Sequence, residues 1–359
     1  MWNERARRAA AAGLVALLVA IGSPLAAQEP PDQDEPTEPA LRQQGVLRLF
    51  GAVEWDVNDR PDSPNSFALG QLDLFLNAAL SERITLLGEF VLEESTATEV
   101  VTDLERLQIT FRFDDHLQVS AGRYHTGIGF YNTAFHHGAW FETAIGRPRV
   151  FLFEDDGGVL PVHDVGITTR GAIPGTRSSL YYLFEVGNGR SIGGVEDEPR
   201  DTNDAKAVNG GIAFRPDRWR GLELGASLRH DVTPQPAVPP VDERIGALYA
   251  VYRTPSTEVL AEWVSMAMRP RGGPQSEDGG GYVQVSHAWG MVRPYYRFDR
   301  LDVDATTPVI GHGEAFTGHL LGLRIDPTTS VGFKAQYERF DAPGHPHGDA
   351  FHTQLVFVF

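Results

Sequence analysis

The sequence predicts an all-β fold, namely a transmembrane up-and-down antiparallel β-barrel of about sixteen strands. Three observations predict it. Apolar and polar residues alternate with a period of two from Gly45 onward, short and long connectors alternate between these segments, and Phe359 lies at the end of such a segment. Strands with one apolar and one polar face suit a wall between lipid and water, and lipid tolerates no open sheet edge. A last strand that pairs with the first would satisfy that requirement.

The alternation assigns a face to each residue of the expected strands. Leu47 and Leu49 lie opposite Arg48 near the start, and Phe333 lies opposite Lys334 near the end. Successive side chains of a strand point to opposite faces, so the apolar set is expected to meet lipid. The opposite faces carry charged residues expected to line a wet lumen: Arg48, Glu54, Arg106, Arg112, Glu223, Arg229, Arg297 and Glu338.

The connectors divide the chain into about sixteen expected strands, an even number as in bacterial barrels. The expected strands are 45–57, 67–80, 84–95, 103–113, 117–126, 163–173, 178–187, 206–215, 221–231, 242–253, 257–268, 280–289, 291–303, 314–325, 330–341 and 350–359. Long connectors are expected at 58–66, 96–102, 127–162, 188–205, 232–241, 269–279, 304–313 and 342–349. Their alternation with short turns predicts one end of the barrel with long loops and one with short turns.

A soluble β-sandwich is the alternative fold for such a pattern. Its apolar faces would point inward, and its connectors would show no two-sided bias in length. The charged faces would then lie in or near a core, where each unpaired charge costs on the order of several kcal/mol. A barrel of about sixteen strands instead leaves an aqueous channel, so the barrel is the favoured interpretation.

The N-terminal residues have the pattern of a secretory signal. Residues 1–27 combine the basic segment NERARRAAAA with the short apolar segment GLVALLVAIG, and cleavage is expected after Ala27. An uncleaved anchor is the alternative, but the apolar segment is short for a membrane span. Residues 28–44 are rich in proline and acidic residues and are expected to form a disordered periplasmic leader. Residues 45–359 are expected to form the barrel domain.

The composition argues against a nucleic-acid partner, disulfide bonds and transmembrane helices beyond the N-terminal segment. The formal net charge of −17 argues against a nucleic-acid partner, which would require a basic surface. The chain has no cysteine, so no disulfide framework holds an exported fold together. No later segment is a long apolar run, so no transmembrane helix is expected after residue 27.

The chain resembles bacterial outer-membrane porins, and most of all the sixteen-stranded group that includes the phosphate-selective O and P porins. The resemblance covers the exported chain and is carried by the segments LQVSAGRYHTGIGFYN, VHDVGITTRGAIPG, LYYLFEVGNGR and QLVFVF, in this order. It implies a channel for small hydrophilic solutes or ions in the outer membrane of a Gram-negative bacterium. It also implies contact with outer-membrane lipid, a terminal Phe359 read by the outer-membrane assembly machinery and, by analogy, a homotrimer.

Two features depart from the phosphate-selective group. Its members line the pore with a ladder of arginine and lysine residues, whereas the luminal charges expected here are of mixed sign and the total charge is strongly acidic. Some relatives also carry an N-terminal coiled coil, for which residues 28–44 show no heptad pattern. Phosphate selectivity is therefore not expected, and the transported solute stays open.

The longest connector, 127–162, would be the third external loop, which in porins typically folds into the barrel and narrows it. Its aromatic residues are expected to fasten it to the barrel wall: Phe130, Tyr131, Phe135, Trp140, Phe141, Phe151 and Phe153. Charged and polar residues around it are expected to form the constriction and set ion selectivity: Arg123, Tyr124, His136, His137, Arg147, Arg149, Glu154, Asp155 and Asp156. A salt-bridged structural loop is the alternative interpretation of the same charges.

The histidines near this loop raise the question of a metal site. His136 and His137 are adjacent and would point to opposite faces of a strand, while His125 and His163 flank the loop. The chain has neither cysteine ligands nor a spacing such as HExxH, so no metal site and no cofactor are expected.

Two further functions compete with a channel. A barrel whose lumen is plugged by its loops would have a structural or adhesive role. A barrel enzyme would need a nucleophile beside a base, and the nearest such pair, Ser227 and His230, is expected on opposite strand faces. Enzymatic activity is therefore not expected, and single-channel conductance would separate a channel from both alternatives.

Overall fold

The computed structural model describes residues 44–58, 66–96, 99–135, 138–154, 156–175, 179–191, 204–234, 239–304, 306–310, 314–343 and 345–359. The expected signal peptide and almost all of the expected leader lie outside these residues, as do His136, His137 and Asp155. Residues 43–359 form one compact unit, which contains the whole barrel.

Within the described residues, sixteen strands form one closed antiparallel barrel in which each strand pairs with its neighbours in the chain. The strands are β1 (Gln44–Asn58), β2 (Ser66–Ala79), β3 (Ile84–Thr96), β4 (Glu99–Arg112), β5 (Gln118–His125), β6 (His163–Ala172), β7 (Leu180–Gly187), β8 (Ala207–Phe214), β9 (Leu222–Thr233), β10 (Val241–Arg253), β11 (Thr257–Pro270), β12 (Ser276–His287), β13 (Val292–Val303), β14 (Glu314–Ile325), β15 (Val331–Ala342) and β16 (His345–Val358). The fold class and strand number predicted from the sequence are confirmed.

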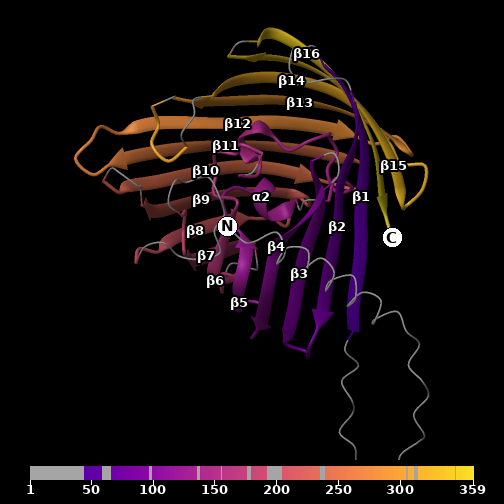
Figure 1. The fold of residues 1–359 in the computed structure, drawn as a ribbon. Helices are drawn as coiled ribbons and strands as arrows, with labels where there is room; N and C mark the ends of the chain where they lie inside the picture. Colours follow the sequence, from indigo (N-terminus) through magenta and orange to yellow (C-terminus); the bar gives the residue numbers. More distant parts are fainter. Residues whose placement is uncertain are drawn as a thin grey trace, which may run out of the picture. The chain divides into compact units, whose positions relative to one another are not determined.

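The barrel closes between its first and last strands, which lie side by side in indigo and yellow (Figure 1). The β1–β16 ladder runs from Phe50 opposite Val358 to Asn58 opposite Ala350. Leu49 and Phe359 exchange two main-chain hydrogen bonds of 2.9 and 3.0 Å. The last residue is thus held in the sheet, as expected for a strand that must leave no edge unpaired.

The two faces of the wall carry the residues that the alternation assigned to them. On β9, Leu228 is 64% exposed on the outer surface, whereas Arg229 is 1% exposed. On β15 the same contrast separates Phe333, at 41%, from Lys334, at 0%. Further large apolar side chains exposed on the wall are Leu47, Leu107, Phe111, Ile167, Leu224, Leu248, Trp263, Leu321, Tyr337 and Leu355. Leu74 departs from the pattern because it is buried between its cross-strand neighbours Leu49 and Phe90.

Several connectors are shorter than the sequence predicts because strand pairing continues beyond the expected ends. The β3–β4 ladder extends to Thr96 opposite Glu99, and the β15–β16 ladder to Ala342 opposite His345. The long connectors predicted at 96–102 and 342–349 are therefore mostly paired strand. Local sequence gives a weak signal there, because polar hairpin ends have the composition of loops.

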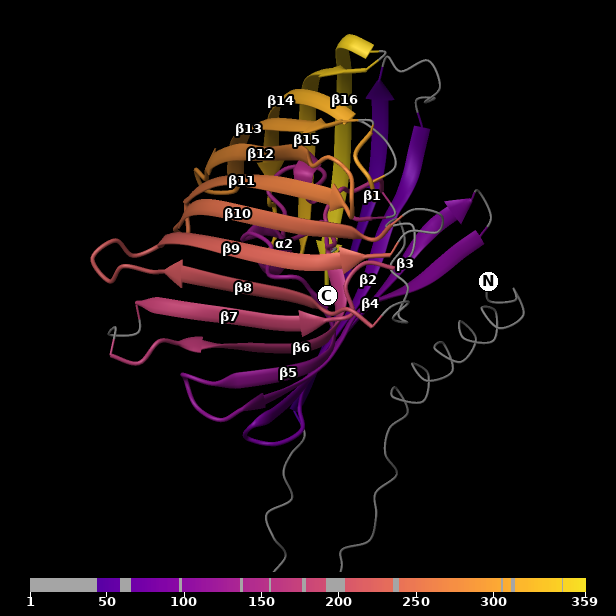
Figure 2. The same ribbon diagram turned by 90° about the vertical axis from the view of Figure 1, so that its left-hand side faces the viewer.

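The long connector between β5 and β6 enters the barrel. It contains the short helix α2 (Tyr131–Ala134) and the 3₁₀ turn η1 (Arg149–Phe151), and both views show α2 within the ring of strands (Figures 1 and 2). Among the described residues, no helix is long and apolar enough to cross a membrane.

An apolar cluster joins this connector to the inner face of the wall. The connector supplies Tyr131, Phe135 and Phe151, and the wall supplies residues such as Leu260 and Met266 on β11. All of these side chains are 3% exposed or less. Part of the barrel interior is consequently a packed core, whereas the sequence predicted water around the charged residues that face inward.

Candidate functional site

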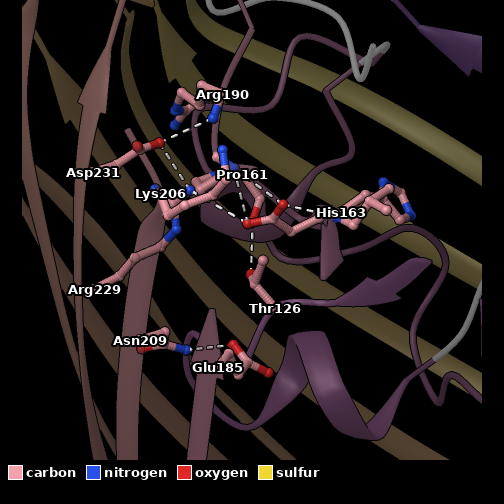
Figure 3. A network of polar contacts seen from close by, with 12 residues as sticks. Thr126, Pro161, His163, Glu185, Arg190, Lys206, Asn209, Arg229 and Asp231 are labelled. Carbon is pink, nitrogen blue, oxygen red and sulfur yellow. Dashed lines mark hydrogen bonds and ion pairs between the residues drawn. The ribbon is translucent and has the colours of Figure 1, made fainter. Parts of the chain in front are cut away.

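The candidate site is residues 126–162, here called the inner loop, together with the wall around it. The two ends of the inner loop meet at the rim of β5 and β6. The N–H of Thr126 donates to the Val162 carbonyl at 2.8 Å, and its hydroxyl donates to the Pro161 carbonyl at 2.7 Å (Figure 3). This closure fixes where the loop leaves and re-enters the sheet.

An acidic residue of the wall holds the first turn of the inner loop. Glu262, on β11, accepts hydrogen bonds from the N–H groups of Phe130 at 2.6 Å and Tyr131 at 2.9 Å. It also accepts the hydroxyl of Tyr282, on β12, at 2.7 Å. Glu262 is 5% exposed, so three donors stabilise a carboxylate that would otherwise be costly to bury.

Basic residues of the wall hold the middle of the inner loop through its carbonyl groups. Arg297 donates to the carbonyl of Gly146 at 2.7 Å, and Arg324 donates to that of Trp140 at 2.8 Å. Lys334 donates to the carbonyl of Ala139 at 2.7 Å. The loop is thus fixed to β13, β14 and β15 by charge-assisted hydrogen bonds, which are stronger than neutral ones.

Aromatic packing adds to these polar contacts. Tyr131 stacks on Phe135 with ring centroids 4.4 Å apart and lies edge-on to the wall residue Tyr282 at 5.7 Å. The Tyr131 hydroxyl donates to Glu142 at 2.8 Å. Burial, followed by the nearby charge of Glu142, raises the pKa of Tyr131 well above its usual range, so this hydroxyl stays protonated.

The charged residues predicted to form the constriction have partners within the loop or on the wall. The Arg147 guanidinium lies 3.9 Å from the ring centroid of Phe153, and its Nε donates to the Phe151 carbonyl at 2.6 Å. Arg149 forms an ion pair with Glu314, at the start of β14. These contacts are those of the alternative interpretation, a salt-bridged structural loop.

The acidic segment of the loop behaves in two ways. Glu154 accepts the N–H of His163 at 3.1 Å and lies 3.3 Å from its ring Nδ1. Burial alone would raise the pKa of Glu154. The charge of His163 and the hydrogen bonds to the carboxylate lower it by more than burial raises it, so the pKa is lowered overall. Asp156 is exposed. Among the described acidic residues predicted to face the pore, Glu154 is half-buried and Asp156 lies at the surface.

Arg123 and Tyr124 lie at the end of β5. The Nε of Arg123 donates to the main-chain carbonyl of Glu105 at 2.9 Å. Tyr124 is 3% exposed. The structure therefore places Arg123 against β4 and buries Tyr124.

Three of the residues predicted to line the lumen are buried in ion pairs. Arg106 lies 2.6 Å from Glu89, and Arg297 lies 2.7 Å from Asp299. Arg229 lies 2.9 Å from Glu243. The expectation that water surrounds these three arginines is wrong, because carboxylates on the wall pair with them and all three are buried. Arg297 also contacts the inner loop, at the carbonyl of Gly146.

The remaining residues of this group are more open. Arg48 and Arg112 are exposed, and Arg112 forms an ion pair with Asp115 in the turn after β4. The half-buried ones each have a wall partner: Glu54 accepts from Gln354, Glu223 pairs with Arg215, and Glu338 lies near His352.

The sequence missed Arg190, which fastens the inner loop to the barrel from the other side. Its Nη2 donates to the Val159 carbonyl at 2.6 Å, and its N–H donates to Asp231, on β9, at 2.9 Å (Figure 3). Its Nε lies 3.1 Å from Glu243, on β10. The segment GNGR gives no local signal of this role, because the partners of Arg190 lie far from it in the chain.

A cavity of about 360 Å³ remains between the inner loop and the wall strands β5 to β10. It reaches Asp115 and Arg215, which lie in short connectors, so it is located toward the end of the barrel with short turns. Its polar lining includes Thr133 from the loop and Gln118, Arg170, Tyr181, Glu223, Ser227 and Tyr249 from the wall. Charges of both signs therefore border the cavity.

Comparisons with known proteins identify the fold. No family model and no curated protein matches the sequence. OmpF of Salmonella typhi, solved in complex with daunomycin, has a TM-score of 0.64 at 11% identity, covering 88% of this chain and 98% of that chain. An anion-selective porin from Comamonas acidovorans has a TM-score of 0.61 at 13% identity, covering 88% and 100%.

OmpT, an outer-membrane protein of Vibrio cholerae, has a TM-score of 0.59 at 10% identity, covering 88% of this chain and 98% of that chain. At such low identity these likenesses establish the fold and do not single out the phosphate-selective O and P group. The chain is a closed sixteen-stranded antiparallel β-barrel that is similar in fold to bacterial porins.

Proposed function

We propose that this protein is an outer-membrane porin that forms a water-filled passage for small hydrophilic solutes or ions. The observation that carries the proposal is the polarity of the wall. Large apolar side chains such as Leu228 and Phe333 are exposed on its outer surface, while charged groups such as Arg229 and Lys334 point inward. A barrel of this polarity is stable in lipid and would expose a large apolar surface in water.

The cavity beside the inner loop is the proposed path of the solute. Its lining contains Arg170, Arg215 and Glu223, with hydroxyl groups from Thr133 and Tyr249. Such a surface suits hydrated solutes and disfavours lipophilic ones. The mixed signs of charge support no narrower choice of solute.

The location and partners follow from the same proposal. The protein is exported by the signal in residues 1–27, is recognised by the assembly machinery through the strand that ends at Phe359, and contacts outer-membrane lipid with its apolar surface. A homotrimer is proposed by analogy with porins. No catalytic role is proposed: Ser227 lines the cavity, whereas His230 is exposed on the opposite face of β9.

Single-channel recording in planar bilayers tests the passage. The purified protein is expected to give discrete conductance steps. Thr133→Trp, which adds bulk in the cavity, should reduce their size, whereas Leu248→Trp on the outer surface should leave it unchanged. Liposome swelling with neutral, anionic and cationic solutes of similar size would then rank the solutes. Absence of steps from a folded barrel would contradict the proposal.

A plugged barrel with a structural or adhesive role is the second candidate, and one observation favours it. The apolar cluster around Tyr131 and Phe151 occupies part of the interior that water would fill in an open channel. In that case the wild-type protein would not conduct, and a variant with the inner loop shortened would conduct.

A further inference from the structure

Three ionisable side chains from three adjacent strands meet at the base of the inner loop. Glu105 lies on β4, and His125 and His163 are directly opposed in the β5–β6 ladder. One ligand-type atom from each lies within 4.8 Å of the other two. All three side chains are more than nine-tenths buried. Two imidazoles and a carboxylate in so small a space form a donor set that binds zinc in many proteins.

Hydrogen bonds fix the orientation of His125. Its Nδ1 lies 3.0 Å from the carbonyl of Asn132, which can only accept, so Nδ1 carries the proton. The Nε2 of the neutral ring is then the atom with the lone pair. In metal-binding histidines, the ring nitrogen that does not bind the metal characteristically donates its N–H to a carbonyl or a carboxylate.

His163 is oriented by a carboxylate instead. Its Nδ1 lies 3.3 Å from Glu154 on the inner loop, while its Nε2 lies 2.8 Å from Glu105. The ring centroids of His125 and His163 are 4.8 Å apart with an interplanar angle of 70°, a T-shaped contact without stacking. The ring of Phe153 stacks on His163 and closes the cluster on its apolar side.

The three donor atoms lie close to the spacing that a metal ion requires. Zinc bonds of 2.0–2.1 Å require ligand atoms about 3.3 Å apart, so side-chain movements of about 1 Å would complete the coordination.

We propose that Glu105, His125 and His163 bind a divalent transition-metal ion, best matched by zinc, with Glu154 and the Asn132 carbonyl orienting the two imidazoles. His125 immediately precedes the inner loop and His163 immediately follows it. The ion would therefore join both ends of the loop to β4 and fix the loop at its base. The proposal goes beyond the channel function and does not depend on it.

The test uses full-length protein without a histidine tag, treated with chelator and refolded in detergent with or without Zn²⁺. Calorimetric titration and metal analysis should show one tightly bound zinc per chain. His125→Gln and Glu105→Gln should each weaken binding by 100-fold or more. His116→Gln is the control, since its ring also contacts a carbonyl, that of Ala172 at 2.8 Å, but is exposed and lies outside the cluster. His136→Gln/His137→Gln should also bind zinc normally.

Substitution by Co²⁺ keeps the proposal falsifiable if a variant fails to fold. The proposed site offers three protein ligands, so Co²⁺ bound to the wild-type protein should be four- or five-coordinate. Cobalt with this coordination number gives intense visible absorption bands. Weak bands of six-coordinate cobalt, or equal zinc binding by His125→Gln and His116→Gln, would overturn the proposal. The cluster would then be a salt bridge of His163 with two carboxylates.

Discussion

Glu262, in the middle of β11, accepts a hydrogen bond of 2.9 Å from the main-chain N–H of Tyr131, at the first position of α2. This contact, repeated by the neighbouring N–H of Phe130, holds a connector that departs from β5 against strands on another part of the wall. The position of the inner loop therefore depends on single polar residues of the wall. Substitutions at those residues therefore test the proposed channel.

Replacing Glu262 with alanine should loosen the inner loop. The variant leaves the N–H groups of Phe130 and Tyr131 and the Tyr282 hydroxyl without their acceptor, which should cost about 2 to 3 kcal/mol of unfolding free energy. Urea unfolding in lipid vesicles measures this cost, and single-channel noise should increase. Glu277→Ala, at an exposed position on β12, is the control and should change stability by about 0.5 kcal/mol or less. Equal effects of the two substitutions would refute this role of Glu262.

Neutralising the acidic segment of the inner loop should shift ion selectivity toward anions. Asp156→Asn is expected to produce the shift because Asp156 is exposed. Glu154→Gln should produce little or none, since the carboxylate is engaged by His163. Reversal potentials in a salt gradient across a planar bilayer measure both effects. If reversal potentials are the same in all variants, including Glu154→Gln/Asp155→Asn/Asp156→Asn, these residues do not face the pore.

Tyr131 should make the barrel sensitive to alkali. The pKa of Tyr131 is raised in the folded state, chiefly by burial, whereas in the unfolded chain the side chain ionises near its ordinary pKa of 10.0. Above that pH the folded state binds more protons than the unfolded state, so stability falls with increasing pH. The stability advantage of wild type over Tyr131→Phe should therefore shrink above about pH 10, by up to about 1.4 kcal/mol per pH unit. A pH-independent difference in urea unfolding would contradict this expectation.

The side chain of Phe359 should matter for assembly more than for stability. Its ring is 75% exposed, while its main-chain groups bond to Leu49. Phe359→Ala keeps those main-chain bonds, so the stability of the refolded barrel should change by about 0.5 kcal/mol or less. The amount of folded barrel in the outer membrane of cells should nevertheless fall, as measured by heat-dependent gel mobility. Normal assembly of the variant would exclude the ring as a recognition signal.

The sequence by itself determined the wall of the barrel. The period of two decides which face most residues of a strand occupy, because it is set by local backbone geometry. Leu228 and Arg229 therefore lie on opposite sides, as predicted. Alternation gives no signal of polarity where both faces are apolar, for example on β11, where Leu260 and Met266 lie in a packed core that no pattern distinguishes from the lipid side.

Only the tertiary structure decided what fills the barrel. In the sequence, Arg297 and Lys334 have the same pattern as charged residues that face water. In the structure, both donate hydrogen bonds to carbonyl groups of the inner loop. The meeting of Glu105 with His125 and His163 depends on the register of three strands, including an irregularity where β4 passes Glu89 on β3. Such contacts join residues far apart in the chain. They form only when the strands and the loop pack together, so the local alternation of residues cannot predict them.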